Sequence, residues 1–486
     1  MKDEKSITRL HVSYAFMIFL MLTTPSKAQE FKGAACVIFV NDEIVLVRDY
    51  LSNRLSFPGG YITQGESPQK AAKRETYEET GLLIAVGPVV STENDSAQYL
   101  CKSNQAIPIL TSHGFESKPL IYALNAPHFS IEIRQVYLAR PDTLKKEELR
   151  FPNQLQVLPD FNRYKEWRSH SVLLSETDIP TSPLHKVELN AISNLQHHLA
   201  PQYDLLFRLF NLAGERMGFF ILIPLIWVFR GWEIGIRCLI LVIMASELDS
   251  VLKVAFALPR PFHVMPKLQR MEAYGFGLPS GHVLIATTFW GYCWYSLKHL
   301  LPTQKQRLSL GLVIFLLTGC ALSRVYWGVH FFSDVIVGAM IGLLTLILFV
   351  YIDNKLPHHW IIRNKYSWLI GLTIISIAAF FTSGLLSSQL GGLTLGLCLG
   401  LRSGKTKILH KATCTRNSDK LFIVSLSIVG LIILDRAAKL AVSYQSSSII
   451  AMLIYFVCHL LIGLWLTIGM YLFLTSRKSR KSRLLS

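Results

Sequence analysis

The chain has 486 residues, of which 51% are hydrophobic and only 17% are charged. A soluble protein of this size has a smaller apolar fraction, so the composition favours a membrane protein over a soluble one. The 49 Lys and Arg residues exceed the 32 Asp and Glu residues. Because many basic residues lie between apolar runs or near the C-terminus, they favour contact with a phospholipid bilayer, and no nucleic-acid partner is expected.

The N-terminus has the pattern of a secretory signal. Basic residues precede an apolar stretch over residues 12–22, and Ser26 and Ala28 place small side chains where a signal peptidase reads the chain. We therefore expect residues 1–28 to be a signal peptide, with an uncleaved anchor as the alternative. In both cases the chain that follows emerges outside the cytoplasm.

The eight cysteines are scattered without a C-x-x-C pair, so neither a zinc site nor a disulfide framework is indicated. Most of them fall in or beside apolar segments. Cys36 and Cys101 are the two that could pair outside the membrane, and the sequence leaves that pairing open.

Residues 29–165 have the mixed composition of a soluble domain. Apolar residues predict strands over residues 33–40, 43–49 and 131–138, and residues 67–80 predict a helix. This alternation is typical of an α/β domain.

Residues 166–204 are polar and contain several Pro and His residues, which suits a linker. Beyond them, apolar runs continue to the end of the chain and predict an all-α, polytopic membrane domain of about nine spans. Some runs are shorter than the roughly 20 residues that a spanning helix needs, so their ends are approximate. The candidate spans are about 205–229, 235–257, 282–297, 308–323, 333–352, 366–382, 384–401, 421–434 and 447–474.

Basic residues divide unevenly between the two sides of these spans. Alternate connections and the C-terminal tail carry most of the Lys and Arg residues of this region, whereas the other connections carry few. The basic side is expected to be cytoplasmic. The first span then enters from outside, which agrees with the signal segment and places the N-terminal domain on the outer side.

A first motif lies in the N-terminal domain. Gly60 and Glu66 are followed, seven residues later, by the run R-E-T-Y-E-E-T-G-L over residues 74–82. This pattern resembles the Nudix signature G-x5-E-x7-R-E-U-x-E-E-x-G-U, with Thr76 standing where an aliphatic residue is usual. The resemblance implies a Nudix hydrolase domain over residues 29–165, an α/β fold in which a mixed sheet lies between helices.

The residues of this motif suit metal-assisted cleavage of a diphosphate. Glu75, Glu78 and Glu79 share one face of the predicted helix, and their repulsion would be relieved by Mg²⁺ or Mn²⁺, which takes oxygen ligands and bridges them to phosphates. Arg74 is placed to pair with a neighbouring glutamate, and Gly60 lets the backbone approach the metal. The alternative, a solvated acidic helix face, does not account for the glycine and arginine in register.

The motif does not identify the general base of the Nudix reaction. Glu116 and Glu132 are candidates, and each also fits an ordinary surface carboxylate. The substrate is equally open, and derivatives of nucleoside diphosphates are among the candidates.

Three further motifs follow in the apolar part of the chain: K-x6-R-P over 253–261, P-S-G-H over 279–282 and S-R-x5-H-x3-D over 323–334. In this order and spacing they resemble the phosphatidic acid phosphatase type 2 superfamily. The resemblance implies a membrane phosphatase domain over residues 205–382. Residues 383–486 would then be accessory transmembrane helices with a basic cytoplasmic tail.

These motifs bring cations to membrane depth. Lys253, Arg260 and Arg324 would each cost at least about 2.5 kcal/mol there if uncompensated, so a resident anion is expected. Phosphate fits, because two arginine forks and one lysine can hold its oxygens. Ser280 and the amide of Gly281, at the start of a helix, would donate further hydrogen bonds.

The resemblance assigns the reaction to two histidines. His330 would attack phosphorus and carry a phosphohistidine, with Asp334 one helical turn on to orient its ring, and His282 would protonate the leaving oxygen and then activate water. No metal is needed for this step. Asp249 lies four residues before Lys253, which predicts a structural ion pair. The alternative for the motif residues is that they are ordinary interfacial side chains that reach the headgroups.

The sidedness of these motifs places the phosphatase site on the outer face of the membrane. An outward-facing bacterial enzyme of the inner membrane resembles phosphatases that act on undecaprenyl diphosphate, phosphatidylglycerophosphate or phosphatidic acid, and the first is the favoured substrate. The Nudix domain would cleave a diphosphate linkage beside it. The alternatives are a localisation fusion in which the Nudix domain acts on soluble nucleotides, and a transporter or scaffold with vestigial sites.

Overall fold

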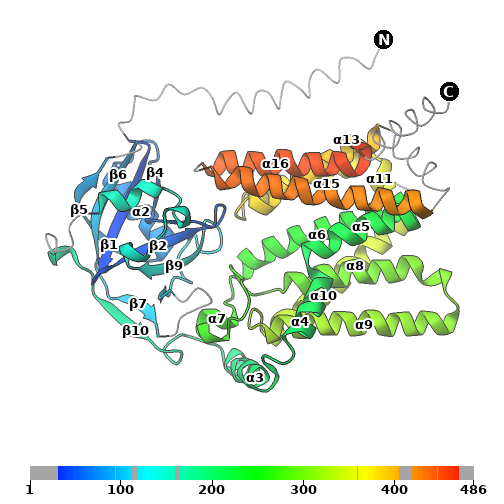
Figure 1. Cartoon of the computed structure of the whole chain (residues 1–486), viewed down its shortest axis with the longest axis horizontal. Helices are drawn as coiled ribbons and strands as arrows, with labels where there is room; N and C mark the ends of the chain where they lie inside the picture. The colour runs from blue at the N-terminus through cyan, green and yellow to red at the C-terminus, as the bar shows by residue number, and fades with distance from the viewer. Residues whose placement is uncertain are drawn as a thin grey trace, which may run out of the picture.

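The computed structural model describes residues 31–469, apart from residues 93–94, 112–117, 159–164, 358–359, 404–416 and 446. The predicted signal peptide, Glu116 and the basic tail lie outside the described residues. The chain folds into a sheet domain followed by a bundle of long helices, here called the helical domain (Figure 1).

The sheet domain is built on one mixed, ten-stranded sheet in the order β10-β7-β8-β9-β2-β1-β6-β5, with β3 paired to β2 and β4 to β1. Strands β1 and β6 are parallel, whereas β1 and β2 form an antiparallel hairpin. The strands are β1 (Gly33–Val40), β2 (Glu43–Asp49), β3 (Leu55–Ser56), β4 (Gly59–Tyr61), β5 (Ile84–Ser91), β6 (Ser96–Ser103), β7 (Ile107–Leu110), β8 (Leu120–Ile121), β9 (Ile133–Ala139) and β10 (Ser171–Leu174).

The predicted helix of this domain is present as α2 (Pro68–Thr80). The Ser67 side chain caps its first turn by accepting a hydrogen bond from the amide of Lys70, and Pro68 occupies the first helical position, where a missing N–H costs nothing. Gly81 ends the helix in the left-handed conformation with φ 72°. The helix that carries the acidic motif therefore begins and ends on local sequence signals.

Cys36 and Cys101 form a disulfide bond. The two residues lie on the neighbouring parallel strands β1 and β6, both of which have a strand on either side. The pairing that the sequence left open is therefore confirmed.

The helical domain follows from residue 183. Its helices are α3 (Pro183–Leu199), α4 (Asp204–Asn211), α5 (Arg216–Arg230), α6 (Trp232–Phe256), α7 (Pro261–Val264), α8 (Gly281–Leu297), α9 (Thr303–Tyr326), α10 (Phe332–Lys355), α11 (Trp360–Arg363), α12 (Lys365–Ala379), α13 (Leu385–Arg402), α15 (Asn417–Ser443) and α16 (Ser448–Leu464). The segment predicted as a linker thus contains β10 and α3, and α3 is bonded to the bundle through Gln196, which donates to the carbonyls of Leu268 and of Tyr326 at the end of α9.

Within the described residues, four helices are long and apolar enough to cross a membrane, and a fifth crossing follows if α4 and α5, bent by 53°, count as one span. The four are Thr303–Tyr326, Phe332–Lys355, Lys420–Ser443 and Ser448–Gly469. The prediction of about nine spans is not confirmed by this measure. Helix α6 is long but carries several charged residues, among them Arg237, Glu247 and Lys253, and α12 has only 15 residues.

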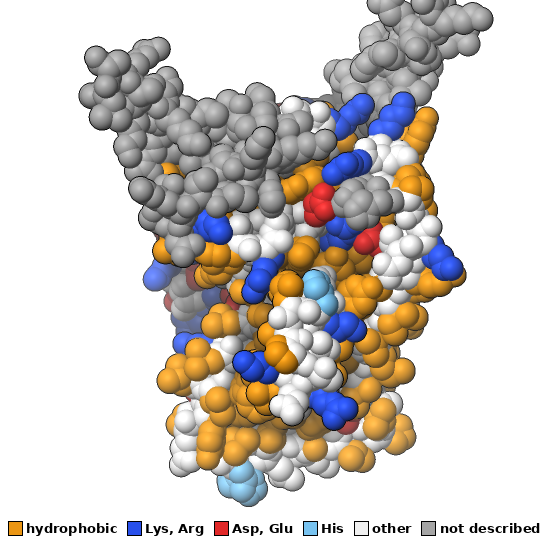
Figure 2. All heavy atoms as spheres, turned by 90° about the vertical axis from the view of Figure 1, so that its right-hand side faces the viewer, with side chains coloured by type: hydrophobic (Ala, Val, Ile, Leu, Met, Phe, Trp, Pro, Cys, Tyr) orange, Lys and Arg blue, Asp and Glu red, His pale blue; other side chains and the backbone are white. Residues whose placement is uncertain are grey.

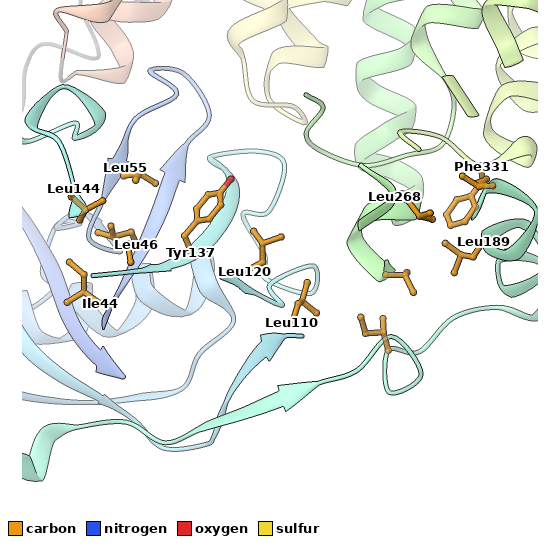
Figure 3. Packing of buried hydrophobic residues seen from close by; sticks show 14 of the residues in the cluster. Ile44, Leu46, Leu55, Leu110, Leu120, Tyr137, Leu144, Leu189, Leu268 and Phe331 are labelled. Atoms are coloured by element: carbon orange, nitrogen blue, oxygen red, sulfur yellow. The ribbon is translucent and has the colours of Figure 1, made fainter. Parts of the chain in front are cut away.

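The apolar core is continuous between the two domains. One buried cluster extends from Ile44 and Tyr137 in the sheet, through Leu110 at its edge, to Leu268 and Phe331 in the helical domain (Figure 3). A shared core of this kind resembles the interior of a single domain, so the sheet domain is firmly attached to the bundle.

The end of the bundle that faces away from the sheet domain carries several Lys and Arg side chains among apolar ones (Figure 2). The helix ends at this side include Arg230, Lys355, Arg363 and Arg402. Within the described part of the chain, basic side chains therefore gather at the end of the bundle opposite the sheet domain.

Candidate active sites

Arg74 organises the acidic motif on α2. Its Nε and Nη2 atoms donate to the two carboxylate oxygens of Glu66, at 3.0 Å each, and Nη1 donates to Glu75 and Glu78 at 2.8 Å each. The guanidinium lowers the pKa of Glu66 to about 2. The predicted pairing of Arg74 with a neighbouring glutamate is confirmed, and it includes three carboxylates.

The glycines of the motif make room for two buried carboxylates. The amide of Gly59 donates to Glu79 Oε2 at 2.9 Å. A Cβ atom on Gly60 would lie 2.5 Å from the carboxylate carbon of Glu75, so only glycine fits there. Glu75 and Glu79 are both less than a tenth exposed, and burial raises the pKa of both, that of Glu79 well above its usual range.

This donor set fits a hard cation. Buried carboxylates with raised pKa values gain most from a bound divalent ion, and Mg²⁺ usually takes one or two carboxylates, with the remaining ligands from water and substrate phosphates. Glu75 and Glu79 are the two buried carboxylates that would hold it. Among the described residues no group of three or more acidic, His or Cys side chains is arranged to hold a metal, and Arg74 holds both Glu75 and Glu78.

The structure brings one candidate general base to this site. Glu132 accepts a hydrogen bond from His128, whose Nδ1 lies 3.0 Å from Glu132 Oε2 and 4.0 Å from Glu78 Oε2. Glu132 is near enough for its charge to act on Glu75 and Glu79. His128 could not be expected from the sequence, since a single histidine in a loop has no spacing signal.

The second site lies where the C-terminal ends of α6 and α9 meet the N-terminal ends of α8 and α10. His330 stands between a cation and a carboxylate: its Nε2 atom is 3.0 Å from Nη1 of Arg260, and its Nδ1 atom is 3.2 Å from Oδ2 of Asp334. Arg260 also donates to the carbonyls of Gly275 (2.8 Å) and Val329 (2.7 Å). All three ionisable side chains are at most 5% exposed.

Lys253 and Asp249 form the predicted ion pair on α6, with 2.6 Å between Nζ and Oδ2. A Cβ atom on Gly281 would lie 2.4 Å from the same oxygen of Asp249. Glycine at the start of α8 therefore lets α6 and its ion pair approach the P-S-G-H motif.

Two buried donors at this site have no hydrogen-bond partner among the described residues. They are Oγ of Ser280, which is fully buried, and Nε of Arg324. Buried polar atoms are nearly always satisfied, so such donors indicate a ligand that accepts hydrogen bonds. The Nη1 atom of Arg324 is held by Oδ1 of Asn211 at 2.7 Å.

The two histidines share the same positive surroundings. Lys253, Arg260 and Arg324 all lie near enough for their charges to act on both His282 and His330. The three motifs, separated by up to 81 positions in the sequence, therefore meet at one place that suits an anion.

Comparison with known proteins agrees with both sites. Residues 30–116 match the family model of the NUDIX domain, and residues 234–358 match that of the PAP2 superfamily. The chain combines a Nudix domain with a PAP2 domain. Both are families of hydrolases, and both motif sets fall within or directly beside the matched residues.

The curated relatives match the PAP2 part. A dihydrosphingosine 1-phosphate phosphatase of Saccharomyces cerevisiae is 29% identical over 196 residues, covering 37% of this chain and 46% of that one. An undecaprenyl-diphosphatase of Sulfolobus acidocaldarius is 33% identical over 130 residues, covering 26% and 59%. The chain spans about half the length of the curated relatives it matches.

Among solved structures, a PAP2-type phosphatidylglycerolphosphate phosphatase from Bacillus subtilis is similar, at 22% identity, covering 38% of this chain and 92% of that one, with a TM-score of 0.33. At that score the similarity carries no argument about the arrangement of the helices.

The PAP2 site has two supports that sequence reasoning missed. Glu188 on α3 accepts hydrogen bonds from the amide (2.7 Å) and the hydroxyl (3.1 Å) of Ser333, in the first turn of α10. Asn211 holds Arg324. An asparagine in an apolar stretch is a detectable signal, whereas Glu188 lies in a polar segment where no pattern distinguishes it.

Proposed function

We propose that this protein is a bifunctional hydrolase of the membrane surface. Its PAP2 domain removes phosphate from a membrane lipid phosphate or diphosphate through a phosphohistidine, without a metal. Its Nudix domain cleaves a diphosphate linkage with Mg²⁺ or Mn²⁺. The observation that carries the proposal is the position of His330, held between the guanidinium of Arg260 and the carboxylate of Asp334.

The PAP2 reaction follows from the tautomer that these contacts favour. Asp334 accepts a hydrogen bond from the N–H at Nδ1 of His330, which leaves the lone pair on Nε2 to attack phosphorus. Arg260 then exchanges its contact with the ring for a phosphate oxygen. His282 gives its proton to the leaving lipid oxygen, and it later takes one from the water that hydrolyses the phosphohistidine.

The other oxygens of the phosphoryl group would be held by the donors that the site offers. Ser280 Oγ and Arg324 Nε are the buried donors described above, and Lys253 adds a positive charge. Such donors stabilise the negative charge that spreads over the equatorial oxygens in the transition state.

At the Nudix site, Glu75 and Glu79 would hold the metal, which activates water and neutralises the diphosphate. Arg74 keeps the carboxylates in place, and Glu132, oriented by His128, is the proposed general base. Glu132 lies close to the two metal carboxylates, as a base that acts on a nearby water must.

Two features support an extracytoplasmic location for both sites. The Cys36–Cys101 disulfide is typical of an oxidising compartment. The basic helix ends lie opposite the Nudix domain, and basic connections are typically cytoplasmic. We propose that the protein resides in a bacterial inner membrane with both active sites on the outer side.

For the substrate we favour undecaprenyl diphosphate. One relative is named as an undecaprenyl-diphosphatase and another as a phosphatase of a long-chain base phosphate. Phosphatidylglycerophosphate and phosphatidic acid are the next candidates. A Nudix site beside the PAP2 site would supply it with lipid monophosphates from diphosphate-linked precursors.

The test is a phosphate-release screen of the full chain over lipid phosphates and diphosphates, with and without a chelator. His330→Ala should reduce release by about 10³-fold or more, since it removes the nucleophile. His198→Ala, an exposed histidine on α3, is the matched control and should retain activity. Release by His330→Ala at the wild-type rate would refute the phosphohistidine, and chelator-sensitive turnover of soluble nucleotides alone would favour the localisation fusion.

A further inference from the structure

A loop of the Nudix domain, residues 126–132, lies between the two active sites. We call it the docking loop. Its amide at His128 donates to the carbonyl of Glu78 on α2 at 2.7 Å, and the amide of Phe129 donates to the carbonyl of Ala126 at 3.0 Å. The amide of Ser130 donates to the carbonyl of Ile133. These bonds fix the loop to the acidic helix and to β9.

The opposite side of the docking loop contacts the PAP2 domain. The Phe129 ring packs edge-on against two PAP2 side chains, with centroid distances of 5.5 Å to Phe276 and 5.3 Å to His263. A Cβ atom on Gly275, whose φ is 72°, would lie 2.6 Å from Oγ of Ser130. The Nudix and PAP2 domains are therefore in direct contact at this point.

Two of the PAP2 residues that the loop touches, Gly275 and His263, hold Arg260. The carbonyl of Gly275 accepts from Nε of Arg260 at 2.8 Å, and Nδ1 of His263 accepts from the Arg260 amide at 3.1 Å. Arg260 in turn contacts Nε2 of His330 at 3.0 Å. His263 therefore joins the Phe129 ring to the backbone amide of Arg260, and Gly275, which lies against Ser130 of the same loop, holds the guanidinium proposed to bind phosphate.

This contact is packed like a protein core. Phe129, Phe276 and His263 are 4%, 6% and 8% exposed, and Phe276 belongs to the same buried cluster as Ile133 and Val136 of the Nudix sheet. A core packed to this density does not deform continuously, so removing a ring leaves a cavity into which the neighbours shift. The neighbours here are Phe276 and His263.

We propose that Phe129 of the Nudix domain is a positioning residue of the PAP2 site: it holds His263 and Phe276, the residue that follows Gly275, so that Arg260 faces His330. This inference rests on the proposed phosphatase function. The Nudix domain then completes the phosphate-binding site of its neighbour, in addition to its own reaction. A displacement of about 1 Å at such a group costs up to about 10²-fold in rate, so the effect is measurable.

The test uses the full chain in detergent and a soluble lipid phosphate, with orthovanadate as a probe of phosphate binding. Phe129→Ala should lower kcat/KM by about 3- to 30-fold, the range reported for residues that act through packing. The inhibition constant of orthovanadate should rise in the same proportion. Phe129→Leu, which refills most of the volume, should restore both values.

A matched control separates positioning from loss of stability. Phe39 is a buried phenylalanine of β1, 1% exposed, in the same Nudix domain. Phe39→Ala should lower Tm but leave KM and the orthovanadate constant unchanged, since loss of folded protein alone reduces only the apparent kcat. If Phe129→Ala behaves in the same way, the positioning role is wrong. If the wild-type chain releases no phosphate from any lipid, the proposed function fails, and this inference fails with it.

Discussion

The guanidinium carbon of Arg134, in the Nudix domain, lies 3.7 Å from the ring centroid of Tyr274, in the PAP2 domain. The same guanidinium donates to the backbone carbonyl of Tyr50 through Nε (3.1 Å) and Nη2 (2.9 Å), and the Tyr50 ring packs edge-on against Tyr274 at 5.5 Å. Tyr274 directly precedes Gly275, whose carbonyl holds Arg260. The interface between the two domains therefore lies beside the PAP2 site.

Arg134→Ala should weaken this interface. Arg134 is 9% exposed, and its guanidinium donates a hydrogen bond to the carbonyl of Tyr50. The substitution removes this hydrogen bond. We expect the free energy of unfolding to fall by about 1–3 kcal/mol, measured as a lower denaturant midpoint. Arg140→Ala is the control, because Arg140 is exposed and its side chain pairs with Asp142, two residues away. Equal midpoints for the two variants would contradict the role of Arg134.

The Arg74–Glu66 pair predicts a pH dependence of stability. Arg74 lowers the pKa of Glu66 to about 2 from 4.5. A carboxylate with a lowered folded pKa stabilises the fold above its unfolded pKa, and this contribution is lost as pH falls through the folded value. The Tm difference between wild type and Arg74→Ala should thus be constant above about pH 5 and shrink towards pH 2. Lys73→Ala, an exposed neighbour on α2, should show no such trend.

Metal binding at the Nudix site should depend on pH. Burial raises the pKa of Glu75 and Glu79, and both must lose their protons to bind a cation. The affinity for Mg²⁺ should therefore increase as pH rises, with protons released on binding. Calorimetry in buffers of different ionisation enthalpy measures that release. A pH-independent affinity would show that these carboxylates are not the ligands.

Glu188→Ala should affect the PAP2 site from outside it. The variant removes the carboxylate that accepts hydrogen bonds from the amide and the hydroxyl of Ser333, in the first turn of α10. We expect a loss of about 0.5–2 kcal/mol in the free energy of unfolding and a lower rate of phosphate release, because the same turn carries Asp334. Glu188→Gln keeps an acceptor and should retain more activity. Glu147→Ala, at an exposed position, serves as the control.

The disulfide predicts sensitivity to reduction. Cys36 and Cys101 close a loop with a sequence separation of 65, and opening it should cost about 2–4 kcal/mol of stability. Thermal unfolding of the Cys36→Ser, Cys101→Ser double variant measures this. Thiol labelling of protein taken from cells checks the compartment, since protein exposed to the cytoplasm would label at both cysteines.

Much of the fold could be predicted because its signals are local. Strands 33–40 and 43–49 are present with the expected bounds, and helix 67–80 begins at the Ser67 cap and ends before Gly81. Capping residues and apolar periodicity act within a few residues of each other, so a sequence displays them directly. The length of the apolar runs alone did not settle the number of spans. The ion pair of Lys253 and Asp249 adds charge to the long helix α6, and other apolar helices are short.

By itself, the sequence determined the local placement of the acidic motif: the spacing of Glu75 and Glu79 places these side chains one helical turn apart wherever the helix lies. His330 and Asp334 have the same spacing, but α10 begins only at Phe332, so the expected helical turn between them is wrong, and Asp334 reaches His330 from the first turn of that helix. Only the tertiary structure decided that Phe129 packs against His263 and Phe276 and that Glu188 caps α10. Contacts between residues more than a hundred positions apart depend on how whole elements pack, and packing selects for shape and volume, which leave no fixed spacing in a sequence.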